Sequence, residues 1–162
     1  MNDLTLSLIE CLKKETEHYR RLIQLAERQK DLLIAGKVES IPENTRLEEK
    51  EVFALGPLAA ERAEFLAKLA PLFGVKNLNL EEAVKKCPSG EAEELQKAAA
   101  DLVQTAKRLD QINRGNGKLL KNALSFANFT LRAVKSGGKT KTFVPDATLR
   151  EENRPSFVNR VV

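Results

Sequence analysis

The chain has 162 residues with a formal net charge of +4, and its composition already excludes several classes of protein. Only 5% of the residues are aromatic and none is tryptophan. The core must therefore consist of Leu, Ala, Ile and Val, which favours helix-on-helix packing over a sheet. Residues 1–131 contain as many acidic as basic side chains, so the whole positive excess lies in 132–162. A body with balanced charge is not expected to bind a nucleic-acid phosphate backbone.

Residues 3–35 are predicted to form the first helix. No Gly or Pro interrupts 4–34, and Gly36 is expected to end the helix. Apolar or tolerated residues recur at alternating steps of four and three, the pattern of a helix that packs lengthwise against others. These residues are Leu8, Leu12, Glu15, Tyr19, Leu22, Ala26, Gln29 and Leu33. We interpret Glu15 and Gln29 as gaps or edges in this contact.

The second helix is predicted over 41–73. Ser40 would be its N-cap, Pro42 would lie in the first turn, and Glu43 would complete a capping box. Gly56-Pro57 inside it predicts a kink or a helix in two pieces, because proline removes a backbone hydrogen bond and clashes with the preceding turn. A short helix capped by Asn79 is expected next, at 79–86.

The most regular segment predicts one long helix over 90–136. Seam positions from 92 to 134 alternate steps of three and four without a slip, as in a coiled coil. The Asn-Gly pairs within 113–117 favour a turn, so a broken helix is the alternative. We expect continuity, because the seam keeps its phase on both sides. The fold class is therefore all-α: an elongated antiparallel bundle or coiled coil over 1–136, followed by a flexible basic tail at 137–162.

The sequence contains no pattern that predicts catalysis. His18 is the one histidine, Cys11 and Cys87 have neither disulfide nor metal spacing, and no glycine-rich phosphate loop is present. We therefore expect no catalytic residue, no metal, no cofactor and no enzyme activity. Without an apolar run of about 18 residues or a signal peptide, the chain is expected to be cytoplasmic and not inserted in a membrane.

The end of the long helix is the candidate binding site. Asn113 and Asn116 occupy seam positions, where a buried Asn either fixes register or, beside Gly115 and Gly117, leaves a polar stretch that another backbone can approach. The apolar residues that follow surround most of the helix, so part of this surface should be exposed to a partner. They are Leu119, Leu120, Leu124, Phe126, Phe129 and Leu131.

Several motifs resemble those of the FlgN-like flagellar export chaperones. The most specific is Leu109-x2-Ile112-Asn113-x2-Asn116-x2-Leu119-Leu120-x3-Leu124, which is similar to the family's LxxxNxxNxxLIxxxL stretch. Thr142-Phe143-Val144-Pro145-Asp146 is similar to a family tail segment that more often has Tyr at the position of Phe143.

The resemblance implies a non-enzymatic chaperone for hook–filament junction proteins. It would prevent their premature assembly and deliver them to the flagellar type III export apparatus. Client binding is expected at the candidate site above, and Phe143 is the candidate contact with the export gate. Two alternatives stay open: a structural helical-bundle adaptor with no flagellar role, and a weak nucleic-acid binder that uses the basic tail. The sequence leaves open whether the protein is a monomer or a homodimer.

Overall fold

The computed structural model describes residues 3–135, and these form helices without any strand, which confirms the all-α prediction. The elements in chain order are α1 (Asp3–Ile34), η1 (Val38–Ser40), α2 (Ile41–Leu69), η2 (Pro71–Phe73), α3 (Leu80–Lys86) and α4 (Ser89–Lys135). The predicted tail at 137–162 lies outside the described residues.

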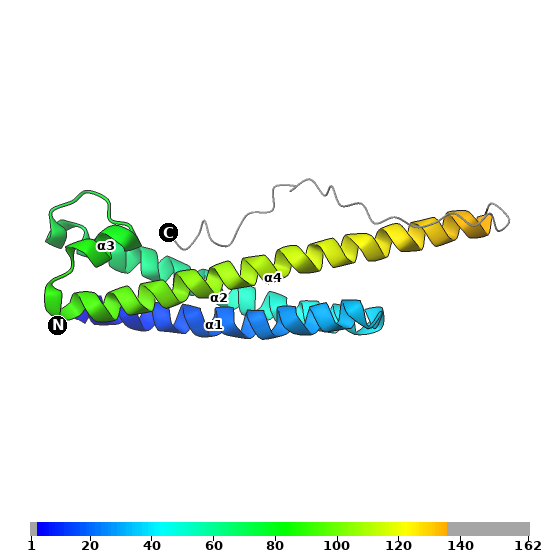
Figure 1. Ribbon diagram of the computed structural model, residues 1–162. Helices are drawn as coiled ribbons and strands as arrows, with labels where there is room; N and C mark the ends of the chain where they lie inside the picture. The colour runs from blue at the N-terminus through cyan, green and yellow to red at the C-terminus, as the bar shows by residue number, and fades with distance from the viewer. Residues whose placement is uncertain (1–2, 136–162) are drawn as a thin grey trace.

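The three long helices form an elongated bundle in which α1 packs against both α2 and α4. α1 and α2 form an antiparallel hairpin. α4 packs along α1 and is parallel to it (Figure 1). Leucines and alanines dominate the core, as the composition predicted. Its most deeply buried side chains include Leu8, Leu12, Leu69, Leu95, Leu102 and Leu109.

The ends of the helices follow local rules, with one exception. Gly36 has a φ of +67° just after α1, so it ends this helix as predicted. Ser40 precedes α2, but its backbone is helical because η1 leads directly into α2, and its side chain makes no capping hydrogen bond. The expected capping box between Ser40 and Glu43 is therefore wrong. At α3 the cap is as predicted, and Asn79 and Glu82 each accept from the other's backbone N–H.

Proline does not divide α2, which runs unbroken through Gly56-Pro57. Pro57 has no N–H to donate to the carbonyl of Phe53 one turn earlier. Phe53, Gly56 and Pro57 are all exposed, so water can reach that carbonyl. The two-piece alternative is therefore wrong, and the proline is tolerated because it lies on the outer side of the hairpin.

The core contains a buried ion pair between α1 and α2. An Nη1 atom of Arg62 donates to Oε2 of Glu15 at 2.7 Å, and Glu15 is only 1% exposed. Burial raises the pKa of Glu15, although the Arg62 guanidinium opposes the shift. The interpretation of Glu15 as a gap in the seam is therefore wrong. Burial and the nearby Glu15 also raise the pKa of Cys11 to about 11, so this thiol stays protonated and unreactive.

The long helix α4 is unbroken from Ser89 to Lys135, including the Asn-Gly pairs, as the constant phase of its seam predicted. It has 47 residues, whereas α1 has 32, and both helices begin at the same end of the molecule (Figure 1). At ~1.5 Å per residue, α4 therefore extends about 22 Å beyond α1. This overhang is the feature that positions the candidate site.

Changing Gly115 to alanine is expected to raise the free energy of unfolding by about 0.5–1 kcal/mol, because glycine in a helix interior costs conformational entropy. A Cβ at this position would meet nothing within 4 Å. Urea denaturation followed by circular dichroism measures the change. Gly36→Ala is the matched control: its φ of +67° is strained for alanine, so this variant should be destabilised. Equal effects at both positions would contradict the continuous helix.

Candidate functional site

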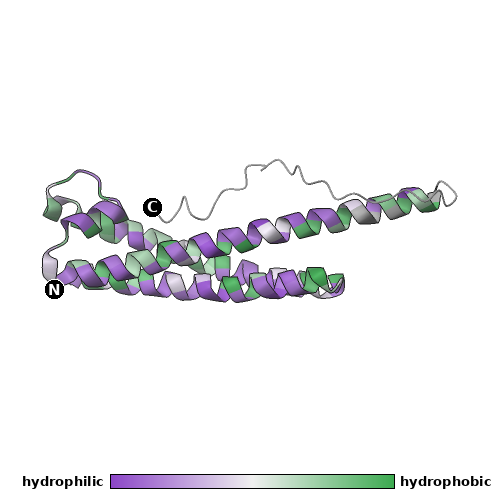
Figure 2. Cartoon of the chain, in the orientation of Figure 1, coloured by the Kyte–Doolittle hydropathy of each residue, from purple (hydrophilic) through white to green (hydrophobic). Residues whose placement is uncertain are grey.

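The covered face of α4 ends at Asn116. Most seam residues up to this point are buried against the hairpin, whereas four large apolar residues beyond it are exposed. The exposed fractions are 37% for Leu120, 59% for Leu124, 59% for Leu131 and 74% for Val134. Steps of four, seven and three residues place these four side chains on one side of the helix. We call them the apolar stripe. Figure 2 shows hydrophobic residues interspersed with hydrophilic ones along the end of α4 beyond the hairpin.

Asn116 is engaged inside the protein. It is 4% exposed, and its Nδ2 atom donates to the backbone carbonyl of Ala26 in α1 at 2.7 Å. Asn113, one turn earlier, is half-buried. Of the two interpretations of the seam asparagines, the geometry at Asn116 favours the one in which it fixes the register of α4 on α1. Its carboxamide is not presented to a partner in this structure.

A second carboxamide, which sequence reasoning did not identify, forms a hydrogen bond from α2 to the backbone of α1. Asn44 of α2 is buried, and its Nδ2 atom donates to the carbonyl of Leu25 at 2.9 Å. Asn44 and Asn116 therefore donate hydrogen bonds to consecutive carbonyls of α1 from two different helices. Nothing local in the sequence distinguishes Asn44 from a surface asparagine near a helix start. Beyond this level α1 has no further residue in the buried core, although the hairpin continues to the turn at Gly36.

The predicted client-binding residues fall into distinct groups. Leu120, Leu124 and Leu131 lie together on the apolar stripe, which Val134 extends. Leu119 and Phe129 are half-buried. Phe126 lies in the same part of α4, but its side chain is outside the described part of the structure, and so is the whole of Phe143.

The end of the hairpin adds exposed apolar residues that were not predicted. Ile34 and Val38 flank the turn at Gly36, and both side chains are mostly exposed. The turn lies at the same level along the bundle as the stretch of α4 where the overhang begins (Figure 1). The signal for these two residues was present in the sequence, since an apolar residue on each side of a helix-ending glycine has no packing partner within its own helix.

His18 and Cys87 are partly or fully buried between helices. His18, which was expected to be a surface residue, is half-buried, with Nδ1 2.5 Å from Oε2 of Glu51 in α2. Burial also raises the pKa of the Cys87 thiol. Among residues 3–135, no group of three or more His, Cys, Asp or Glu side chains could hold a metal ion.

The hollow on the α1–α4 side is lined by charges of both signs. It has a volume of about 490 Å³, and its charged lining residues are Lys13, Lys14, Glu17, Arg20, Glu94, Lys97 and Asp101. None of the predicted client-binding residues lies there. The apolar stripe is therefore the surface whose chemistry best suits a partner, because it can bury apolar area on another helix.

Comparison with known proteins gives two matches. A family model described as FlgN protein matches residues 1–151. The uncharacterized protein YvyG of Bacillus subtilis (strain 168) is 27% identical over 124 residues, which cover 76% of each chain. No solved structure matches the chain. In the part of the chain that the structure describes, no helix is long and apolar enough to span a membrane.

Proposed function

Because the chain belongs to the FlgN family of flagellar export chaperones, we propose that its clients are hook–filament junction proteins, which it binds in the cytoplasm. It prevents their premature assembly and delivers them to the flagellar type III export apparatus. It acts by binding alone, without catalysis.

The observation that carries the proposal is the exposed apolar stripe on the overhang of α4. Four large apolar side chains on one side of a helix are costly to leave in water, at about 25 cal/mol per Å². A client that offers an amphipathic helix would bury this area by packing along α4. While bound, the client's own apolar face would be covered, which is how premature assembly would be prevented.

Phe143 is proposed to contact the export gate. It follows Lys135, the last residue of α4, by eight positions, so an extended chain would place it up to about 26 Å from the helix end. The gate contact at Phe143 and the client contacts on the apolar stripe would thus use different residues of the chain. Both contacts could be made at once, as handing a client to the export apparatus requires.

Deleting residues 132–162 is expected to reduce co-purification of a hook–filament junction protein several-fold, because the deletion removes Val134 and the segment after α4. Phe143→Ala in the full chain should leave co-purification unchanged and lower export of the client in a motile strain. Circular dichroism should show that both variants stay helical. Full client retention by a folded deletion variant would contradict the site, and normal export by Phe143→Ala would contradict the gate contact.

A further inference from the structure

The charged residues of α4 are separated along its length. Acidic side chains are confined to 89–110, and the last of them, Asp110, already pairs with Arg114 at 2.9 Å. Between 111 and 135 the helix has only basic charges, at Arg114, Lys118, Lys121, Arg132 and Lys135. The zero net charge of residues 1–131 conceals this separation. The overhang is therefore both apolar and positively charged.

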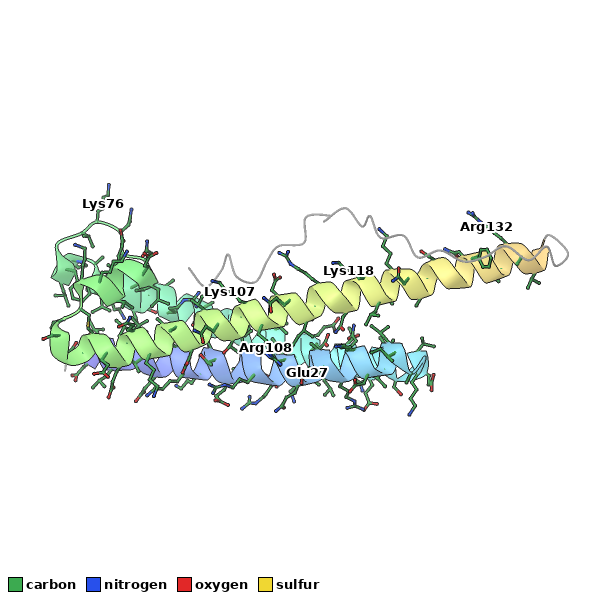
Figure 3. All side chains as sticks on the ribbon, in the orientation of Figure 1. Glu27, Lys76, Lys107, Arg108, Lys118 and Arg132 are labelled. Carbon is green, nitrogen blue, oxygen red and sulfur yellow. The ribbon has the colours of Figure 1, made fainter. Side chains whose placement is uncertain are left out.

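Two of the basic residues follow the apolar stripe along one edge. Lys121 comes directly after Leu120, and Arg132 comes directly after Leu131. Since neighbouring residues in a helix are about 100° apart, each base lies on the same side of its leucine. Lys121 and Arg132 are exposed, and we call them the basic row. Lys118 is exposed too, but it lies about 160° around the helix from Leu120, on the side opposite the apolar stripe. Figure 3 shows Lys118 and Arg132 on the side of α4 that faces away from α1.

The helix dipole can account for Arg132, in the last turn of α4, but not for the earlier bases. The partial negative charge at a helix C-terminus favours bases only within about the last turn. Lys118 and Lys121 lie several turns before Lys135, where the dipole has little influence. Pairing within α4 does not account for them either, because no acidic residue occurs between 111 and 135.

We propose that the partner helix bound by the apolar stripe carries a row of Asp and Glu residues along one edge. Its apolar side packs on Leu120, Leu124, Leu131 and Val134, and its acidic edge faces the basic row. This inference rests on the proposed function, whose client it describes chemically. A nucleic-acid backbone would pair with the same bases but would leave the leucines exposed, so the stripe favours a helix. Complementary charge along one edge also fixes which way the partner helix lies.

Two synthetic peptides test the acidic edge. Both form the same amphipathic helix with the same apolar side, but the edge residues are Glu in one and Lys in the other. Fluorescence anisotropy with the full chain measures their affinities. The acidic peptide should bind roughly tenfold more tightly at low salt, and the difference should shrink as salt screens the charges. The double variant Lys121→Glu, Arg132→Glu should reverse the order of affinities.

The matched control reverses two exposed lysines elsewhere, Lys50→Glu and Lys76→Glu, and should retain the preference for the acidic peptide. Equal affinity for both peptides would overturn the acidic edge while leaving the client surface intact. A chain that binds neither peptide but still retains a junction protein would also overturn the acidic edge. The other contrary outcome is duplex DNA that binds more tightly than the acidic peptide and binds the double variant Leu120→Asp, Leu124→Asp equally well. That result would overturn the acidic-edged helix in favour of a phosphate backbone as the partner. The proposed function itself fails separately, through loss of junction-protein co-purification.

Discussion

Replacing Arg62 by methionine is expected to lower the free energy of unfolding by about 3–5 kcal/mol at neutral pH. The guanidinium lies 2.7 Å from the carboxylate of Glu15, and both side chains are buried. Without Arg62, the carboxylate would remain in an apolar core without its counter-charge. Urea denaturation of the variant and the wild type, followed by circular dichroism, measures the loss.

The loss of unfolding free energy in Arg62→Met should depend on pH. Burial raises the pKa of Glu15, and Arg62 opposes this shift, so the pKa should rise further in the variant. A carboxyl with a raised pKa in the folded state favours folding at pH values below its ordinary pKa, and this contribution is lost as pH rises through the raised value. The variant should therefore be least destabilised at about pH 4 and most destabilised above neutrality.

The double variant Glu15→Leu, Arg62→Met separates the ion pair from packing. Replacing a buried pair by apolar residues of similar volume is often neutral or stabilising. The double variant should therefore recover most of the stability lost in Arg62→Met. A single variant with the same loss at pH 4 and pH 8, or a double variant as unstable as the single one, would show that the charge of Glu15 is not the cause.

The helices could be predicted from sequence because the information is local. Gly36 and Asn79 act on their own turns, and the phase of the α4 seam is a property of one segment. Glu15 was misinterpreted because its partner Arg62 is 47 residues away, on a different helix. No local pattern indicates that a charged residue on a seam has a buried counter-ion. Asn44 was missed for the same reason, since its partner is a backbone carbonyl of α1.

The candidate site could be predicted in part. The apolar residues at the end of α4 were identified from their density, but which of them are exposed depends on where the hairpin ends beside α4. That point is set by the register of α4 on α1, which Asn116 helps to fix. The charge separation in α4 was present in the sequence, but summing charge over 1–131 averaged it away. A running sum along α4 shows it, because the last acidic residue of this helix is Asp110.

Changing Leu120 and Leu124 together to aspartate is expected to weaken client binding at least 100-fold. The two side chains are half of the apolar stripe, where a client helix would bury them, and a few buried side chains contribute most of the affinity of an interface. Each aspartate would also bring a charge into apolar contact, which is unfavourable without a partner. Isothermal titration of the full chain with a purified junction protein measures the change.

The matched control is Leu6→Asp with Leu72→Asp, because these leucines are also exposed but lie in α1 and η2, away from the overhang. Both double variants add the same charge and remove the same apolar side chains, so a general effect on solubility or stability would appear in both. Only the first pair lies on the proposed client surface. Because the covered seam of α4 ends at Asn116, aspartates at Leu120 and Leu124 should leave the bundle folded. A client that binds both double variants equally well must contact the protein elsewhere.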